Sequence, residues 1–273
     1  MRNRPARLDR NAEISHLPLI TVVTVVFNGE KFLDDTIRSV IALTYPKVEY
    51  IIIDGGSTDG TLNIIKNNIN FIDFYISESD QGIYDAMNKA LSFASGEWII
   101  FLNAGDVFFA PNTLDLVFSA SLQNKDVDVL YGNVHIRYSE FSRIEKAGKL
   151  SRLWSGMKFS HQSVFVRLAY HKLIKFNVSN RIAADLEFFY SAYKKDAHFK
   201  YVDLTISSVI TGGISESNRI NTILASRDAI LKTNDSMVIA ILYYYFCVDA
   251  GIRSLFKDIL PKKITKFIIS KKG

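Results

Sequence analysis

Carboxylate and amide side chains follow each apolar segment in the first half of the sequence. They are Asn28 and Glu30 after residues 19–26, Asp54 after residues 48–53, Asp80 after residues 72–77, and Asn103 and Asp106 after residues 97–102. If these segments are neighbouring parallel strands, their carboxyl ends meet at one edge of the sheet, where ligands of such sheets bind. The spacing therefore predicts a polar ligand site at that edge.

Asp54 closes an apolar segment, where an uncompensated carboxylate would be costly to bury. One interpretation is that Asp54 or Asp59 caps the glycine-rich loop of residues 54–60, because aspartates commonly organise turns. The alternative is that Asp54 recognises a nucleotide base. The spacing alone leaves both open.

Asn103 and Asp106 suit a hard divalent cation such as Mg²⁺ or Mn²⁺. Such ions take oxygen ligands and need few protein carboxylates when phosphates supply the rest. The alternative is a simple turn in which Asp106 caps a helix over residues 110–119 or pairs locally.

The elements that must position these groups alternate between strand and helix patterns. Residues 19–26 and 48–53 are apolar runs typical of buried parallel strands, and residues 30–43 and 83–94 carry apolar side chains at helical spacing. Parallel neighbours need crossover helices, so the first half predicts a doubly wound sheet. Shorter strands at 127–134, 163–167 and 201–210 follow, with a helix near 185–193 and mostly helix after 220.

The sequence lacks the signature motifs of several protein classes. The loop after the first strand reads FNGEKF, without the G-x-G-x-x-G of dinucleotide-binding proteins, and no G-x-x-x-x-G-K-[ST] phosphate loop occurs. Cys247 is the single cysteine, which excludes an intramolecular disulfide and a cysteine-based zinc site. The sequence therefore favours a different kind of polar ligand site.

The charge and hydropathy pattern bears on location. The 273 residues are 48% hydrophobic with a net charge of +5, and basic residues concentrate near both ends. No apolar stretch of signal-peptide length precedes Pro18, and the apolar run 237–248 is shorter than the roughly 20 residues that span a bilayer. We expect no nucleic-acid partner, because no predicted strand alternates aromatic and basic residues.

Sequence blocks of these loops resemble, in order and spacing, the family 2 glycosyltransferases of the GT-A fold. The blocks are residues 18–29 (PLITVVTVVFNG), 54–61 (DGGSTDGT), 78–90 (ESDQGIYDAMNKA) and 96–106 (GEWIIFLNAGD). The resemblance covers about residues 18–215 and is nearest to the branch acting in colanic acid, capsule and other surface-polysaccharide pathways. It implies an α/β fold, a Rossmann-like, mostly parallel sheet with flanking helices, plus a helical C-terminal appendage.

The resemblance also implies a nucleotide-sugar donor site. Asp54 would bind the base, and Asp80 with Gly82 would lie near the ribose or donor sugar. The residues expected to line the same pocket as Asp54 are Thr24, Asn28 and Glu30. The family's D-x-D metal motif is replaced by residues 103–106 (NAGD), so Asp106 is the one carboxylate ligand and Asn103 its companion.

Two blocks of the second half also resemble the family, residues 160–167 (SHQSVFVR) and 182–189 (IAADLEFF). The second matches the acidic block whose aspartate is the catalytic base, which implies that role for Asp185. Inversion needs such a carboxylate to take the acceptor's hydroxyl proton. Asp185 could instead be a first-turn acid favoured by the helix dipole, and Glu187 is a second candidate. His161 is expected to contact the diphosphate or the metal, unless it is a buried core histidine.

The C-terminal region combines aromatic, aliphatic and basic residues. Such a composition suits the headgroup layer of a membrane, although burial against the catalytic domain or in a homodimer fits residues 238–248 as well. Three regions are predicted: a basic tail (1–17), a catalytic domain (18–217, divided into a nucleotide-binding half 18–110 and an acceptor half 111–217), and a helical, basic region (218–273). Gly212 and Gly213 begin a segment that resembles a family loop over the donor.

Together these features predict a cytoplasmic, inverting glycosyltransferase, peripheral to the inner face of the cell membrane. It would move a sugar, most simply from a UDP-sugar, to a hydroxyl of a lipid-linked oligosaccharide, with Mn²⁺ or Mg²⁺ as cofactor. The alternative is a non-catalytic sugar-nucleotide-binding or scaffold protein of the same pathway.

Overall fold

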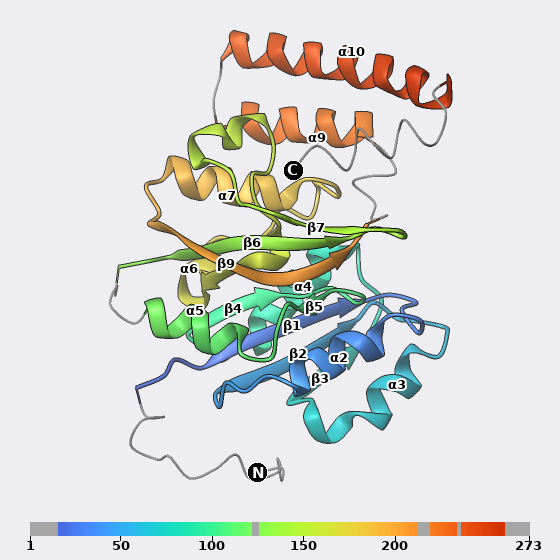
Figure 1. Cartoon of the computed structure of the whole chain (residues 1–273), viewed down its shortest axis with the longest axis vertical. Helices are drawn as coiled ribbons and strands as arrows, with labels where there is room; N and C mark the ends of the chain where they lie inside the picture. The colour runs from blue at the N-terminus through green and yellow to red at the C-terminus, as the bar shows by residue number, and fades with distance from the viewer. Residues whose placement is uncertain (1–15, 122–125, 212–218, 234–235, 260–273) are drawn as a thin grey trace.

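The computed structural model describes residues 16–121, 126–211, 219–233 and 236–259 (Figure 1). Most of the predicted basic tail, the predicted donor loop that begins at Gly212 and the lysines from Lys262 onward lie outside these residues. The strands form a nine-stranded sheet in the order β3-β2-β1-β4-β8-β6-β9-β5, with β7 paired to β6. The two C-terminal helices stack beyond one side of this sheet (Figure 1).

The first half alternates strands and helices as its pattern predicted. Its elements are β1 (Ile20–Val26), α2 (Leu33–Ile41), β2 (Val48–Asp54), α3 (Thr61–Asn67), a short 3-10 turn η1 (Ile69–Phe71), β3 (Phe74–Ser77), α4 (Ile83–Phe93) and β4 (Trp98–Phe101). Strands β3, β2, β1 and β4 pair in parallel. Val26 lies opposite Asp54, and Asp54 opposite Ser77, so the carboxyl ends of the three strands are level.

The second half adds further strands and the remaining helices. Its elements are β5 (Val107–Phe108), α5 (Thr113–Ser121), β6 (Val129–Arg137), β7 (Ser142–Glu145), η2 (Leu150–Ser155), η3 (His161–Ser163), β8 (Val164–Arg167), α6 (Leu168–Leu173), α7 (Ala184–Lys194), β9 (Phe199–Ile210), α9 (Arg219–Leu231) and α10 (Met237–Ile259).

The sheet is mixed in this half, whereas the sequence predicted a mostly parallel one. Strand β8 runs antiparallel to β4 and β6, and β6 runs antiparallel to β7. Short connections such as the one from β6 to β7 allow antiparallel pairing, because they need no crossover helix. Strand β3 starts at Phe74, later than predicted. The carboxylate of Asp73 accepts a hydrogen bond from the Tyr50 amide at 2.8 Å, and the regular pairing of β3 with β2 begins at the next residue.

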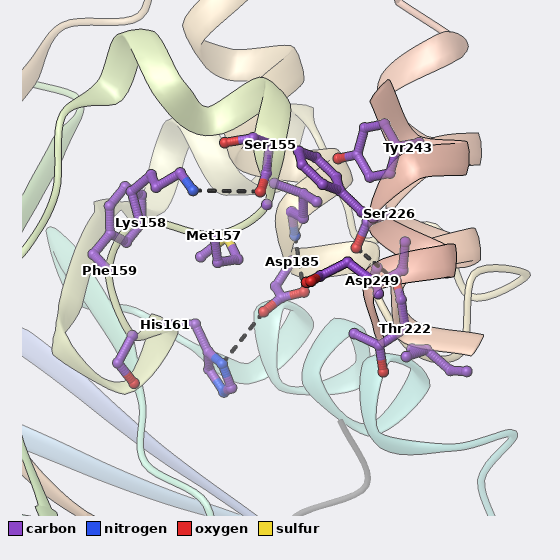
Figure 2. Close-up of a pocket in the computed structure, with 17 residues that line it drawn as sticks. Ser155, Met157, Lys158, Phe159, His161, Asp185, Thr222, Ser226, Tyr243 and Asp249 are labelled. Atoms are coloured by element: carbon purple, nitrogen blue, oxygen red, sulfur yellow. Dashed lines mark hydrogen bonds and ion pairs between the residues drawn. The ribbon is translucent and has the colours of Figure 1, made fainter. Parts of the chain in front are cut away.

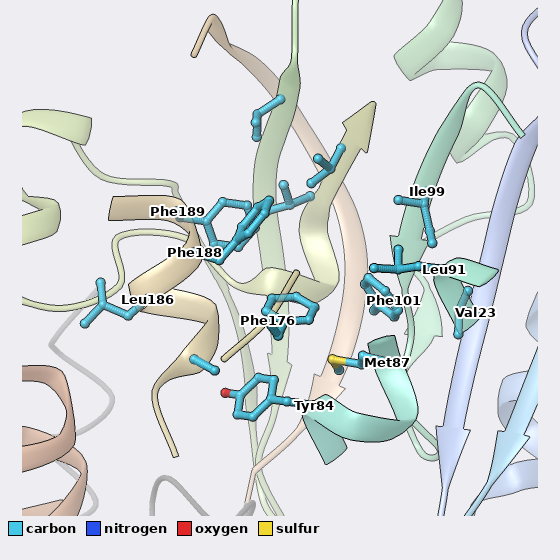
Figure 3. Close-up of a cluster of buried hydrophobic side chains, with 14 of the residues drawn as sticks. Val23, Tyr84, Met87, Leu91, Ile99, Phe101, Phe176, Leu186, Phe188 and Phe189 are labelled. Atoms are coloured by element: carbon cyan, nitrogen blue, oxygen red, sulfur yellow. The ribbon is translucent and has the colours of Figure 1, made fainter. Parts of the chain in front are cut away.

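Two apolar layers cover the sheet, because successive side chains of a strand point to opposite faces. Val22 and Val26 belong to one layer, and Val23 and Val25 to the other. The second layer joins α4 and β4 to α7, where Phe188 and Phe189 pack in the same cluster as Phe101 and Met87 (Figure 3). This cluster holds the start of α7 near the strand ends of the first half.

Candidate active site

Asp54 is fully buried at the end of β2 and organises the loop that follows. Its carboxylate accepts hydrogen bonds from the Ser57 amide at 3.0 Å, the Gly56 amide at 3.2 Å and the Ser77 hydroxyl at 2.6 Å, and the Ser57 hydroxyl donates to its other oxygen. The structure therefore shows Asp54 capping the loop that follows it, as in the first interpretation. A base contact by Asp54 stays a prediction.

The loop after β1 is joined to this second loop by hydrogen bonds. Asn28 has a φ of 50°, in the left-handed region, and its side-chain oxygen accepts from the Thr58 amide at 2.9 Å. The carboxylate of Glu30 accepts from the Gly60 amide at 2.7 Å. Asn28 and Glu30 thus lie together beside the Asp54 loop, as the sequence predicted.

Thr24 does not reach this group of loops. It is fully buried in β1, and its hydroxyl shares a 3.0 Å hydrogen bond with the hydroxyl of Tyr50 on β2. The expectation that Thr24 lines a donor pocket fails in this arrangement, because its side chain faces the core layer of Tyr50.

Asp80 and Gly82 form the third loop of the edge. The Asp80 carboxylate accepts from the Gly82 amide at 2.8 Å, and Gly82 has a φ of 120°, which only glycine adopts readily. A Cβ at Gly55 would lie 2.4 Å from the Asp80 carboxylate. Glycine at 55 therefore lets the second and third loops close against each other.

Asp106 and Asn103 lie in the loop between β4 and β5. Asp106 is 7% exposed, and the Gln162 side-chain amide donates to it at 3.0 Å. Burial raises the pKa of Asp106 to about 6, although His161 and Gln162 favour the carboxylate. The side-chain oxygen of Asn103 is buried and has no hydrogen-bond partner among the residues that the structure describes. Arg137 donates to the Gly105 carbonyl at 2.9 Å.

This loop fits a cation held jointly with phosphate oxygens. The described residues contain no group of three or more His, Cys, Asp or Glu side chains that could hold a metal ion by themselves. They do offer the Asp106 carboxylate and the unsatisfied oxygen of Asn103, and both are hard oxygen donors. A cation at this place would need a diphosphate to complete its coordination.

Asp185 occupies the first turn of α7 and is 16% exposed (Figure 2). The Tyr84 hydroxyl donates to it at 3.0 Å, the Leu186 amide at 2.8 Å, and Nδ1 of His161 lies 3.5 Å away. Burial alone would raise the pKa of Asp185. The net pKa is nevertheless lowered, because His161, the Leu186 amide and Tyr84 all favour the charged form. Asp185 is therefore ionised at neutral pH, as a general base must be.

His161 connects Asp185 with the Asn103–Asp106 loop. Its Nε2 lies 3.3 Å from the side-chain nitrogen of Asn103, and its Nδ1 faces Asp185. The Asn103 side-chain nitrogen can only donate, so Nε2 is the ring atom that faces Asn103 and Nδ1 the one that faces the carboxylate. The imidazole thus links the proposed base to the proposed metal loop.

Glu187, the second candidate for the base, is used elsewhere. It accepts hydrogen bonds from Asn177 at 2.9 Å, Asn180 at 3.0 Å and Lys232 at 2.8 Å. The Lys232 contact ties α7 to the end of α9. Glu187 does not line the cavity next to Asp185.

A cavity of about 640 Å³ opens beside Asp185 (Figure 2). His161 and Asp185 point towards each other at one end, and helices α9 and α10 form a wall. The sequence did not predict the hydrogen bond from Tyr84 to Asp185 or the one from Gln162 to Asp106. It also did not predict that α9 and α10 line the cavity. Tyr84 stands inside a recognised block, which was the one available signal for it. Nothing in the spacing placed α9 or α10 beside the base.

Solved glycosyltransferase structures have the same fold. S. aureus TarS, residues 1–349 in complex with UDP, matches with a TM-score of 0.62 and 20% identity over 79% of this chain and 66% of that one. A mannosyltransferase from Pyrobaculum calidifontis, in complex with GDP-Man and Mn²⁺, matches with a TM-score of 0.60 and 16% identity over 86% and 70%. The mixed sheet with flanking helices is the GT-A fold, so the predicted fold class is confirmed.

Sequence comparison narrows this class to one family. A family model for glycosyl transferase family 2 matches residues 21–199. The PGL/p-HBAD biosynthesis glycosyltransferase of Mycobacterium bovis is 30% identical over 206 residues, which cover 73% of this chain and 80% of that protein. The chain belongs to glycosyl transferase family 2 and is a transferase, as its sequence blocks predicted.

Proposed function

We propose that the chain transfers one sugar, with inversion, from a UDP-sugar to a hydroxyl of a lipid-linked oligosaccharide in bacterial surface-polysaccharide biosynthesis. One observation carries the proposal: Asp185 lines an open cavity, and His161 links it to Asn103 at the edge of polar loops. A donor in the loops and an acceptor in the cavity would then meet at the base.

In this reaction the acceptor oxygen attacks the anomeric carbon as Asp185 takes its proton, and the bond from that carbon to the diphosphate breaks. Inversion follows from a single displacement with one base. Asp106 and Asn103 would hold a divalent cation whose charge stabilises the leaving diphosphate. His161 keeps the Asp185 carboxylate oriented towards the acceptor side.

The donor is proposed to occupy the loops around Asp54. The hydrogen bonds that join Asn28 to Thr58 and Glu30 to Gly60 give these loops one fixed shape, which is what recognition of a nucleotide requires. Asp80 and Gly82 border the same edge. UDP is favoured, and TarS, a neighbour in fold, carries UDP in its solved structure.

The lipid-linked acceptor is motivated by α10. Two adjacent tyrosines of this helix differ sharply: Tyr243 is 2% exposed and Tyr244 is 74% exposed. The exposed large apolar residues of the helix recur at helical spacing, and we call them the outer stripe: Met237, Val238, Ile241, Tyr244, Tyr245 and Val248. An apolar, aromatic face of this kind suits the interfacial layer of a membrane. Peripheral attachment to the inner face of the membrane is therefore part of the proposal.

None of the helices in the described part of the chain combines the length and hydropathy needed to cross a bilayer. The sequence also allowed this region to be buried against the catalytic domain. The face of α10 opposite the outer stripe is buried in this way. Tyr243 donates to the Trp154 carbonyl at 2.8 Å, and Ile239 and Phe246 pack on the main core. Burial therefore accounts for one face of α10, and membrane contact is what we propose for the other.

A panel of UDP-, GDP- and TDP-sugars with Mn²⁺ tests the proposal by thermal shift, because a bound donor stabilises the fold according to its affinity. We expect UDP-sugars to give the largest shift and to be slowly hydrolysed. The second candidate, a non-catalytic sugar-nucleotide-binding protein, is motivated by the single carboxylate of residues 103–106. Donor binding without hydrolysis or transfer, with any acceptor tried, would favour it.

A further inference from the structure

The cavity beside Asp185 is separate from the proposed donor loops. None of Asp54, Asp80 and Asp106 lines it, whereas Asp185 and His161 do. At about 640 Å³ it is far larger than the voids that close-packed interiors leave, and it lies within the range of small-molecule sites. His161, which lines the cavity, also contacts the Asn103 side chain, so the cavity adjoins the proposed metal loop.

Four separate segments build the walls of this cavity, and one of them is the start of α7 with Asp185 and Leu186. Met157 and Phe159 come from the segment after η2, Ile223 from α9, and Tyr243 and Phe246 from α10. These side chains form an apolar, aromatic part of the wall, beside polar residues that include Lys158 and Asp249. Figure 2 shows Tyr243 and Ser226 on the side of the C-terminal helices, and His161 and Asp185 at the other end.

The aromatic wall is held in a defined position. The hydrogen bond from Tyr243 to the Trp154 carbonyl, 2.8 Å long, fastens α10 to η2 across the cavity. Lys232 of the segment after α9 pairs with Glu187 of α7 at 2.8 Å. Phe159 packs edge-to-face on Phe189 of α7, with ring centroids 5.2 Å apart. The wall is thus attached to the helix that carries Asp185.

We propose that this cavity binds the acceptor through an apolar or aromatic group attached next to the reacting hydroxyl, so that α9 and α10 are part of the acceptor site. The inference rests on the proposed glycosyl transfer. A hydroxyl at Asp185 leaves the neighbouring group of the acceptor against Met157, Phe159 and Phe246. A free sugar would leave that apolar wall in contact with water, whereas an apolar substituent would cover it.

Paired phenyl and methyl glycosides of the same sugars test this inference. Glucose, galactose, mannose, N-acetylglucosamine and rhamnose glycosides are titrated into the full chain with UDP and Mn²⁺, and binding is measured by calorimetry. We expect at least one phenyl glycoside to bind about tenfold or more tightly than its methyl partner, because it buries more apolar surface. Equal affinities for every pair, or no binding by any glycoside, would overturn the inference.

Two variants fill the cavity from α9. Thr222 is half-buried and Ser226 buried, and both line the cavity. Thr222→Phe and Ser226→Phe should abolish the phenyl preference while UDP still shifts the melting temperature as in the unchanged chain. Tyr244→Ser, on the outer stripe next to Tyr243, is the matched control and should keep the preference. A preference that survives in a folded Thr222→Phe protein would also overturn the inference.

The proposed transfer and the acceptor cavity fail in different ways. If UDP does not bind the unchanged chain, the donor proposal is contradicted. If UDP binds and donor is hydrolysed, but phenyl and methyl glycosides bind alike, only the assignment of the cavity is lost.

Discussion

Tyr84 and Asp185 are 101 positions apart in the chain, yet the Tyr84 hydroxyl donates a 3.0 Å hydrogen bond to the Asp185 carboxylate. Tyr84 is the second residue of α4, which follows the Asp80–Gly82 loop, and its ring centroid lies 5.4 Å from that of Phe176 in the main core. The helix that follows a proposed donor loop therefore also orients the proposed base. Movement of that loop would reach Asp185 through one hydrogen bond.

Replacing Tyr84 by phenylalanine tests this connection. Tyr84→Phe removes a donor to the carboxylate, so the pKa of Asp185 should rise and the acid limb of kcat should move to higher pH. We expect the acid-side fall in transfer to begin at a higher pH than in the unchanged chain, and transfer near about pH 8 to stay within about twofold. Tyr50→Phe, which removes a buried hydroxyl bonded to Thr24, is the control. An unchanged acid limb in Tyr84→Phe would contradict the proposed link.

Asp185→Asn removes the proposed proton acceptor while keeping the shape of the side chain. Transfer should fall by about 100-fold or more, and the affinity for UDP with Mn²⁺ should change by less than about threefold. Glu187→Gln is the matched control, because Glu187 binds Asn177, Asn180 and Lys232 instead of facing the cavity. Normal turnover in Asp185→Asn would exclude Asp185 as the base.

Asp106→Asn should raise the stability of the fold while weakening the metal-dependent binding of UDP. The pKa of Asp106 is raised from 3.8 to about 6, so the folded state binds its proton more tightly than the unfolded state does. The ionised group therefore costs stability, by an amount that grows as pH rises from about 4 to about 6 and is constant above that. We expect the free energy of unfolding of Asp106→Asn to increase by on the order of 2 kcal/mol near pH 8, and by less near pH 5.

In Asp106→Asn, the affinity for UDP should be the same with Mn²⁺ as with EDTA, whereas Mn²⁺ should raise it in the unchanged chain. Titration with UDP under both conditions measures this. Gln162→Glu is a useful comparison, because it turns the donor to Asp106 into a second carboxylate. Equal UDP affinity of Asp106→Asn and the unchanged chain in Mn²⁺ would show that Asp106 is structural only.

The outer stripe of α10 is expected to hold the chain on anionic membranes. The double variant Ile241→Glu with Tyr244→Glu places two charges on this exposed stripe and should lose co-sedimentation with anionic vesicles. Binding of the unchanged chain should weaken with salt, because the lysines that follow in the sequence contribute by charge. Asn221→Glu with Thr233→Glu, at exposed positions of α9 and just after it, adds the same charge elsewhere. If both double variants sediment like the unchanged chain, the outer stripe is not the attachment site.

The sequence by itself determined the alternation of strands and helices, and hence the edge where the polar loops meet. It did so because strand and helix periodicities are local, and because parallel neighbours force their carboxyl ends to one side. Asn28, Glu30, Asp54 and Asp80 accordingly lie in loops that touch one another. The family blocks likewise singled out Asp185 and His161 without any contact being known.

Only the tertiary structure decided which of these side chains face one another. Thr24 faces the core layer of Tyr50 because strand register selects its face of the sheet. Sequence spacing carries no record of the packing that brings His161 between Asn103 and Asp185, since these residues belong to different elements. The same holds for α10, whose opposite faces meet the cavity and solvent: its helical spacing is local, but which face is covered depends on η2 and α9.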